Sequence, residues 1–222
     1  MVGSFDGKQI TPESGKQYYV TGTIYAAQTF TNIPEANGRR IQIGWSRISH
    51  KAMPFNSLML MPTELKSKST KNGVRLFSEP VKETEQLFTG INKWTNLKAD
   101  AANENSTQYN KEASLRLKNK LKLSHATSAG ISLNGQKILD YDMNFNLVNG
   151  TFYSPEDLTS MEINADIYID KTSIEVFIDG GAFSYSMERK LDVNNKEGVK
   201  FGGNNMEVKD LEVFSVKSFG NL

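Results

Sequence analysis

Short runs in which apolar and polar residues alternate recur along most of this chain. Residues 39–45 place apolar side chains on every second position, and residues 114–118 and 120–123 alternate leucine with serine, arginine or lysine. Successive side chains of a β-strand point to opposite faces of a sheet. This period of two therefore predicts strands with one apolar face and one polar face.

Residues 114–123 also allow a competing interpretation as a helix, which would run through Leu117 and Leu121. The strict alternation favours strands, and it predicts that one face is solvated and basic. That face would carry Arg116, Lys118, Lys120 and Lys122. An anionic partner is the alternative use of such a face, but the chain as a whole has no basic excess, so we expect a solvated strand surface.

Turn signals separate the strands of the second half of the chain. Asn134 and Gly135 stand between two short apolar runs and supply the two positive φ angles of a type I′ hairpin. Residues 170–172 and 179–181 are turns by composition between β-branched and aromatic runs. Short strands at such intervals predict a β-sandwich.

The first half predicts a smaller β unit and a connector. Residues 3–65 contain three or four antiparallel strands by pattern, the size of one propeller blade or of a small meander. The alternation then stops, and Pro80 suits the first turn of a short helix that Ser78 or Glu79 would cap.

The sequence as a whole predicts an all-β chain in three parts. A blade-like antiparallel segment spans about residues 1–75, a short helical connector spans 76–92, and a β-sandwich spans 93–222. Within the sandwich, residues 103–110 are expected to form a mobile loop.

Composition excludes several classes of function. The chain has 222 residues, with 26 Lys and Arg against 25 Asp and Glu, a balance that argues against an electrostatic nucleic-acid binder. It has no cysteine, which excludes disulfides, thiolate catalysis and cysteine-ligated metals. With His50 and His125 as its only histidines, a histidine-rich metal site is excluded as well. We expect neither a metal nor a cofactor. We also expect no membrane span, because no stretch approaches the roughly 20 apolar residues that cross a bilayer.

Several segments carry a resemblance by their order and spacing, at residues 24–30, 38–45, 59–65, 80–83 and 170–180. Together they resemble the C-terminal part of glycoside hydrolase family 32, whose members include invertases, levanases and inulinases. Residues 24–30 and 38–45 resemble the last blade of the family's five-bladed propeller. Residues 59–65 are similar to its Met-Thr-Leu-Pro-Arg-Glu-Leu stretch, and residues 80–83 look like its domain connector. Residues 170–180 resemble the family's Asp-Arg-Ser-Ser-Val-Glu-Val-Phe signature in a concanavalin-like C-terminal sandwich. The match in order and spacing covers nearly the whole chain.

The resemblance implies a retaining hydrolase of fructan or sucrose as the parent, of secreted or periplasmic bacterial origin. Such enzymes use two carboxylates, a nucleophile and a general acid/base, and a third acidic residue stabilises the transition state. In the family these residues lie in Asn-Asp-Pro-Asn, Arg-Asp-Pro and Glu-Cys motifs, all in earlier blades. None of these motifs occurs in this sequence. We therefore expect no catalytic residue in the chain, no hydrolase activity from it alone, and carbohydrate as a partner only through the parent.

Five residues of the blade segment are candidate substrate contacts. Aromatic rings stack on sugar faces and an amide can bond two hydroxyls, although aromatics in strands are more often part of a core. The candidates are Tyr25, Gln28, Trp45, Arg47 and His50. The family has an acidic residue where Thr23 stands, and its long loop after Gly-Trp is shortened here, so the parent's specificity is open.

Three carboxylates are assigned structural roles. Asp170 lies in a turn and Glu175 on a strand of the signature segment, where it faces solvent or pairs with a neighbour. Glu64 follows Pro62 in an apolar run, and a buried carboxylate there needs a partner. Arg39 or Arg40 is the candidate for that ion pair.

Two alternatives to the hydrolase interpretation remain open. The sandwich could be an independent carbohydrate-binding module if its aromatic residues form an exposed platform. The platform candidates are Trp94, Tyr109, Tyr141, Tyr153 and Tyr185. The blade segment could instead pair with a second copy through its open strand edge.

Overall fold

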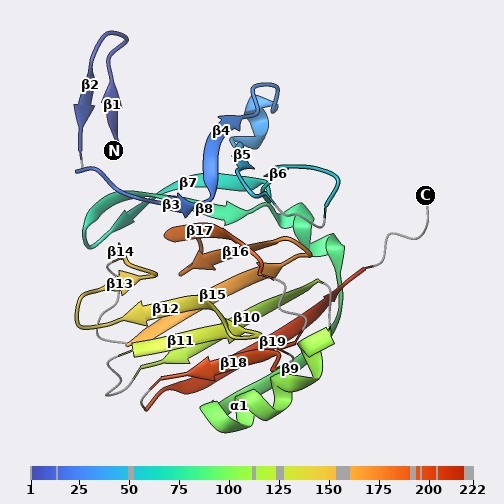
Figure 1. The fold of residues 1–222 in the computed structure, drawn as a ribbon. Helices are drawn as coiled ribbons and strands as arrows, with labels where there is room; N and C mark the ends of the chain where they lie inside the picture. Colours follow the sequence, from blue (N-terminus) through green and yellow to red (C-terminus); the bar gives the residue numbers. More distant parts are fainter. Residues whose placement is uncertain are drawn as a thin grey trace.

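The all-β prediction is confirmed by the structure (Figure 1). A computed structural model describes residues 2–13, 15–49, 53–111, 114–123, 128–153, 161–190, 194–195, 197–203 and 205–217. Two packed sheets form a β-sandwich, a third sheet lies against one end of it, and a small hairpin precedes them.

The third sheet, which we call the blade sheet, has the order β4-β5-β7-β8 with β6 paired to β5. It includes β4 (Ile24–Thr29), β5 (Arg40–Ser46), β6 (Leu58–Met59), β7 (Thr63–Thr70) and β8 (Gly73–Pro80). A short 3₁₀ turn, η1 (Glu35–Asn37), joins β4 to β5. The N-terminal hairpin pairs β1 (Gly3–Phe5) with β2 (Ile10–Pro12).

The connector is helical as predicted, but it begins later. Pro80 is the last residue of β8, where it pairs with Thr63, and the 3₁₀ helix η2 (Lys82–Leu87) follows. The residue before η2 is Val81, which makes no side-chain cap, so Ser78 and Glu79 are not caps. Pairing with β7 extends the strand through Pro80, because proline is tolerated at an edge strand where no ladder N–H is needed.

The sandwich consists of a seven-stranded sheet, order β3-β17-β16-β15-β10-β19-β9, and a five-stranded sheet, order β14-β13-β12-β11-β18. The first contains β3 (Val20–Gly22), β9 (Phe88–Lys98), β10 (Leu115–Lys122), β15 (Glu162–Ile169), β16 (Ser173–Ile178), β17 (Phe183–Glu188) and β19 (Glu207–Val216). The second contains β11 (Ser128–Leu133), β12 (Gln136–Asp142), β13 (Leu147–Val148), β14 (Thr151–Phe152) and β18 (Val199–Gly202).

The facing sides of the two sheets form the core. Leu117, Leu121 and Ile167 of the larger sheet and Ile131 and Leu139 of the smaller one are at most 1% exposed. Residues 114–123 are therefore a strand and not a helix. Between β11 and β12 the expected hairpin is present, with positive φ at both Asn134 and Gly135.

Residues 103–110 are not the loop that the sequence predicts. Ala99–Ser106 form the helix α1, and Thr107–Lys111 form the 3₁₀ helix η3. Ala102 and Ser106 are fully buried, and the Ser106 hydroxyl lies 2.8 Å from the carbonyl oxygens of both Ala102 and Val199. Docking onto β18 orders a segment whose polar sequence gives no sign of it.

The blade sheet meets the sandwich along a line of backbone hydrogen bonds, which we call the seam. Strand β3 adds to the seven-stranded sheet by parallel pairing with β17, although it belongs to the predicted blade segment. The amide of Thr23 donates to the carbonyl of Ser186 (3.0 Å), and the amide of Ser78 donates to that of Gly181 (2.8 Å). The predicted division at residues 75 and 92 stays a prediction, but the seam ties both parts together.

Two glycines make this close approach feasible. Gly22 (φ +91°) and Gly181 (φ +80°) both lie in the left-handed region, and a Cβ on either would collide with backbone atoms across the seam. The obstructing atoms belong to Ser186 for Gly22 and to Ser78 for Gly181. Only glycine meets both the conformational and the steric demand.

We predict that Gly22→Ala destabilises the chain more than Gly73→Ala does. Gly73 has nearly the same φ (+90°), but nothing lies within 4 Å of its hypothetical Cβ. Both variants carry the left-handed strain of about 1–2 kcal/mol. Gly22→Ala adds an overpacking cost of about 1–3 kcal/mol. Urea unfolding measures the difference, and equal losses in the two variants would show that the seam is not tightly packed.

Candidate functional site

Three of the five expected sugar-contact residues form one exposed cluster on the blade sheet. The rings of Tyr25 and Trp45 meet edge to face with their centroids 5.6 Å apart. The guanidinium carbon of Arg47 lies 3.9 Å from the centre of the Tyr25 ring. Tyr25 is 61% exposed and Trp45 is 38% exposed, so neither ring belongs to the core.

The strand pairing of the blade sheet places these side chains. A bulge between Ile24 and Ala26 interrupts the β4–β5 ladder at Tyr25. Trp45 pairs with Met59 of β6, and the amide of Arg47 donates to the carbonyl of Thr23 (2.9 Å). Bulges redirect a side chain relative to the regular pleat, which brings Tyr25 next to Trp45.

The other two candidates are not part of this cluster. Gln28 is exposed further along β4, opposite Ile43. His50 lies outside the described residues. The sugar-contact assignment of all five residues stays a prediction.

Glu64 makes the ion pair expected of it. Arg39 Nε donates to its carboxylate (3.1 Å), and the two terminal nitrogens of Arg39 donate to Glu83 (2.8 and 3.0 Å). These hydrogen bonds from Arg39 lower the pKa of Glu83 to about 2. The trio links the blade sheet to η2, which supports a structural role for Glu64.

Glu175 lies at the seam, where both of its carboxylate oxygens accept the backbone N–H of Met61 (3.0 and 3.1 Å). Burial raises the pKa of Glu175 to about 7, against the opposing effect of the Met61 hydrogen bond. The cavity beside it, about 390 Å³, is lined mainly by apolar side chains, including Leu58, Leu87 and Phe88. The carboxyl therefore faces the segment of the blade between β6 and β7.

Asp170 shapes the turn between β15 and β16. Its amide donates to the carbonyl of Ser173 (2.9 Å), and its carboxylate accepts the hydroxyl of Ser114 (2.7 Å). Arg189 donates to its backbone carbonyl (2.9 Å). These contacts support the turn role that the sequence suggests.

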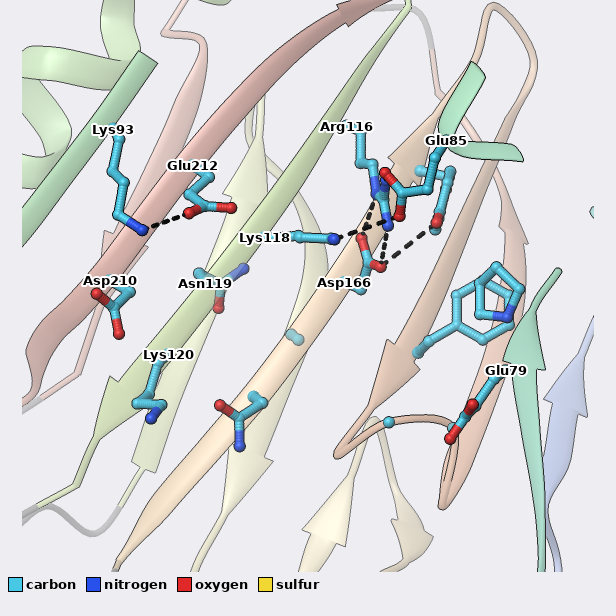
Figure 2. Close-up of a pocket in the computed structure, with 17 residues that line it drawn as sticks. Glu79, Glu85, Lys93, Arg116, Lys118, Asn119, Lys120, Asp166, Asp210 and Glu212 are labelled. Atoms are coloured by element: carbon cyan, nitrogen blue, oxygen red, sulfur yellow. Dashed lines mark hydrogen bonds and ion pairs between the residues drawn. The ribbon is translucent and has the colours of Figure 1, made fainter. Parts of the chain in front are cut away.

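A groove crosses the part of the seven-stranded sheet that the blade sheet leaves open (Figure 2). It encloses about 480 Å³ over strands β9, β19, β10 and β15, with Glu79, Pro80 and Gly181 on its blade side. We call it the sheet groove. The sequence does not predict this groove, because it depends on which strands become neighbours and on where the blade sheet ends.

The basic face predicted on β10 forms the floor of this groove, but it is not simply solvated. Arg116 is 2% exposed and binds Asp166 through two hydrogen bonds (2.8 and 2.7 Å) and Glu85 through a third (2.7 Å). Its guanidinium carbon also lies 4.7 Å from the centre of the Tyr168 ring. Burial opposes the charge on Arg116, but the hydrogen bonds outweigh it and raise the pKa. Acidic partners from β15 and η2 thus offset the charges of Arg116, Lys118 and Lys120, which look like a basic stripe on their own strand.

The aromatic platform proposed for the sandwich is wrong. Tyr109, Tyr141, Tyr153 and Tyr185 are all buried, between 1% and 7% exposed. The hydroxyls of Tyr185 and Tyr153 bond inward, to the carbonyl of Ile138 and to Asp179, each at 2.5 Å. Trp94 is partly buried against the core. Their rings fill the sandwich, because a tyrosine whose hydroxyl finds a partner is readily buried.

The fold defines a class of architecture, a β-sandwich joined to one blade-like sheet. No family model matches the sequence. It is 34% identical over 113 residues to a levanase of Bacillus subtilis (strain 168), covering 47% of this chain and 17% of the levanase.

Solved structures extend the likeness over nearly the whole chain. An exo-inulinase from Aspergillus awamori superimposes with a TM-score of 0.71 and 14% identity, covering 97% of this chain and 49% of that one. A fructofuranosidase from Schwanniomyces occidentalis gives 0.70 and 13%, covering 97% and 52%. Fructan 1-exohydrolase IIa from Cichorium intybus gives 0.60 and 17%, covering 96% and 51%.

The resemblance to the C-terminal part of family 32 glycoside hydrolases is thus confirmed, in fold along the chain and in sequence over part of it. The chain spans about half the length of these solved structures and 17% of the levanase. Within the described part of the chain, no helix is long and apolar enough to span a membrane.

The position of Glu175 predicts a pH dependence of stability. Its pKa is 4.5 as a reference and about 7 in the fold, so between these values the folded chain holds a proton that the unfolded chain has released. The free energy of unfolding then falls as pH rises through this window. A shift of this size corresponds to roughly 3 kcal/mol.

Glu175→Gln keeps an acceptor for Met61 and removes the titration, so it should remove this part of the pH dependence. Urea unfolding of the unmodified chain and of the variant at pH 5 and pH 8 measures this difference in stability. Titrations that oppose it, such as that of Glu83, are common to both chains and cancel in the comparison. If the two chains lose stability equally between these pH values, Glu175 does not titrate as inferred.

Proposed function

We propose that this chain supplies the last propeller blade and the bracing β-sandwich of a family 32-type hydrolase of fructan or sucrose, and that alone it has no hydrolase activity. Its relatives are a levanase, an inulinase, fructofuranosidases and a fructan exohydrolase. The bracing role that we propose for the sandwich rests on the contacts that hold the blade sheet.

One observation carries the proposal: the blade sheet is fixed on its sandwich side and exposed on the side of the aromatic cluster. The seam hydrogen bonds and the Glu175–Met61 contact hold one side. Tyr25, Met59 and Phe55 are each at least 50% exposed. A single blade cannot close a propeller. The last blade of one therefore needs a side held by the sandwich and an uncovered side that packs against the preceding blades.

The absence of hydrolysis follows from the chemistry of retaining glycosidases. Their two carboxylates stand about 5–5.5 Å apart on either side of the scissile bond. Two carboxylates of the family-like segments are engaged in structural contacts, since Glu64 is paired with Arg39 and Glu175 accepts a hydrogen bond from the Met61 amide. Neither is free to act as a nucleophile or as a general acid.

The blade cluster suits a supporting role at the sugar. The exposed rings of Tyr25 and Trp45 offer apolar surface to the carbon face of a fructosyl unit. Arg47, held over Tyr25, offers planar N–H donors to its hydroxyls. In this arrangement the cluster positions substrate, and the catalytic carboxylates come from preceding blades.

We predict that the chain alone releases no fructose from sucrose, levan or inulin. Co-expression with the preceding four blades of a family 32 enzyme should restore release, and Trp45→Ala should lower kcat/KM of that complex about tenfold, equivalent to about 1.4 kcal/mol. Phe30→Ala is the matched control, because Phe30 directly follows β4, is 49% exposed and lies outside the cluster. Fructose release by the chain alone would sink the proposal.

A second candidate function is self-association through the open edge of the blade sheet. Among the residues that the structure describes, strand β4 pairs only with β5, and residues 25–28 of it are exposed. An unpaired strand edge is a template for a second chain. Light scattering distinguishes the two, since a monomer at high concentration argues against this alternative.

A further inference from the structure

The sheet groove is a second candidate site, on the sandwich and away from the blade cluster. Its floor is formed by outward-facing residues of four neighbouring strands, and Figure 2 shows their side chains gathered over β19, β10 and β15. Cavities of some hundreds of Å³ with convergent polar groups are the usual form of a small-ligand site. At about 480 Å³ the groove is of that size.

The strand register sets opposite charges side by side across this floor. In one row across the strands, Lys93 lies opposite Glu212, Glu212 lies opposite Lys118, and Lys118 lies opposite Asp166. In the next row, Asp210 lies opposite Lys120, and Lys120 lies opposite Asn164. The floor is therefore a lattice in which every ammonium group has a carboxylate on a neighbouring strand.

Part of this lattice is already committed to holding the fold. Lys93 binds Glu212 (2.6 Å), and Arg116 is held by Asp166 and Glu85. The row of Asp210 and Lys120 is less engaged. Lys120 lies 3.8 Å from Glu162, and Asp210 makes no ion pair within the described part of the chain. These two groups keep hydrogen-bonding capacity for a ligand.

The chemistry of the row selects the class of ligand. A carboxylate only accepts hydrogen bonds, an ammonium only donates them, and a hydroxyl does both. Adjacent hydroxyls can therefore bridge Asp210 and Lys120. An anion would meet carboxylates beside each lysine, and an apolar ligand would leave these charges desolvated without partners.

We propose that the sheet groove binds a neutral oligosaccharide through its hydroxyl groups, with Asp210 and Lys120 as its main contacts. The inference draws on the proposed function only for the identity of the sugar, a fructan. It gives the sandwich a binding role of its own, which the buried tyrosines could not supply. The rigid Arg116 cluster forms one end of the site and keeps its shape fixed before binding.

Titration calorimetry and affinity electrophoresis of the full chain, with inulin and levan oligosaccharides, test this proposal. We expect the unmodified chain to bind and the Asp210→Ala, Lys120→Ala double variant to bind at least tenfold more weakly. Lys122→Ala is the matched control, because Lys122 follows on the same face of β10 but does not line the groove, and its affinity should stay within twofold. Thermal unfolding of each variant verifies that it is folded.

Three outcomes would overturn the inference. The unmodified chain could bind no neutral glycan, it could prefer dextran sulfate to inulin and levan, or Trp45→Ala could abolish binding while the double variant keeps it. The last result would place the sugar at the blade cluster and leave the proposed function intact. Binding of another neutral glycan but not of fructans would instead support the groove and count against a fructan-hydrolysing parent. Fructose release in the co-expression assay tests the proposed function separately.

Discussion

The backbone-to-backbone seam is the constraint on which the rest of this structure depends. Main-chain groups of residues 19, 23 and 78 bond directly to the edge strand and turn of the sandwich, with no layer of side chains between them. Such an approach is feasible because Gly22 and Gly181 carry no Cβ. The seam fixes where the blade sheet ends, and so it determines which strands of the seven-stranded sheet stay covered and which form the sheet groove.

A polar seam has an electrostatic consequence that an apolar one would not have. Met61 presents a backbone N–H to the sandwich, and a buried N–H without an acceptor is costly. Glu175 supplies the acceptor, but its carboxylate must then leave water, which is why its pKa rises to about 7. The strand end that Glu175 holds leads directly from Met59, the partner of Trp45. A contact in the sandwich thus supports the geometry of the exposed rings on the blade.

Local patterns predicted the elements whose cause is local, and missed those whose cause is distant. Alternation identified β10, and Asn134-Gly135 identified the hairpin between β11 and β12, because period and turn chemistry depend on adjacent residues. The Arg39–Glu64 pair followed from the cost of a buried carboxylate. The helix α1 and the burial of Arg116 could not be read in this way. Each depends on a partner brought by the fold, β18 for the helix and Asp166 for the arginine.

The same limit explains why the aromatic residues were hard to assign. Tyr25 and Tyr185 both lie on strands, and nothing in their neighbouring residues separates an exposed ring from a buried one. The sheet decides: β17 is covered by the second sheet of the sandwich, whereas β4 is an edge strand. The rings of the four sandwich tyrosines listed above therefore stabilise the fold, whereas those of Tyr25 and Trp45 on the blade are exposed. In the site that we propose on the sandwich, the groups that face a ligand are therefore the less engaged Asp210 and Lys120 of the sheet groove and not aromatic rings.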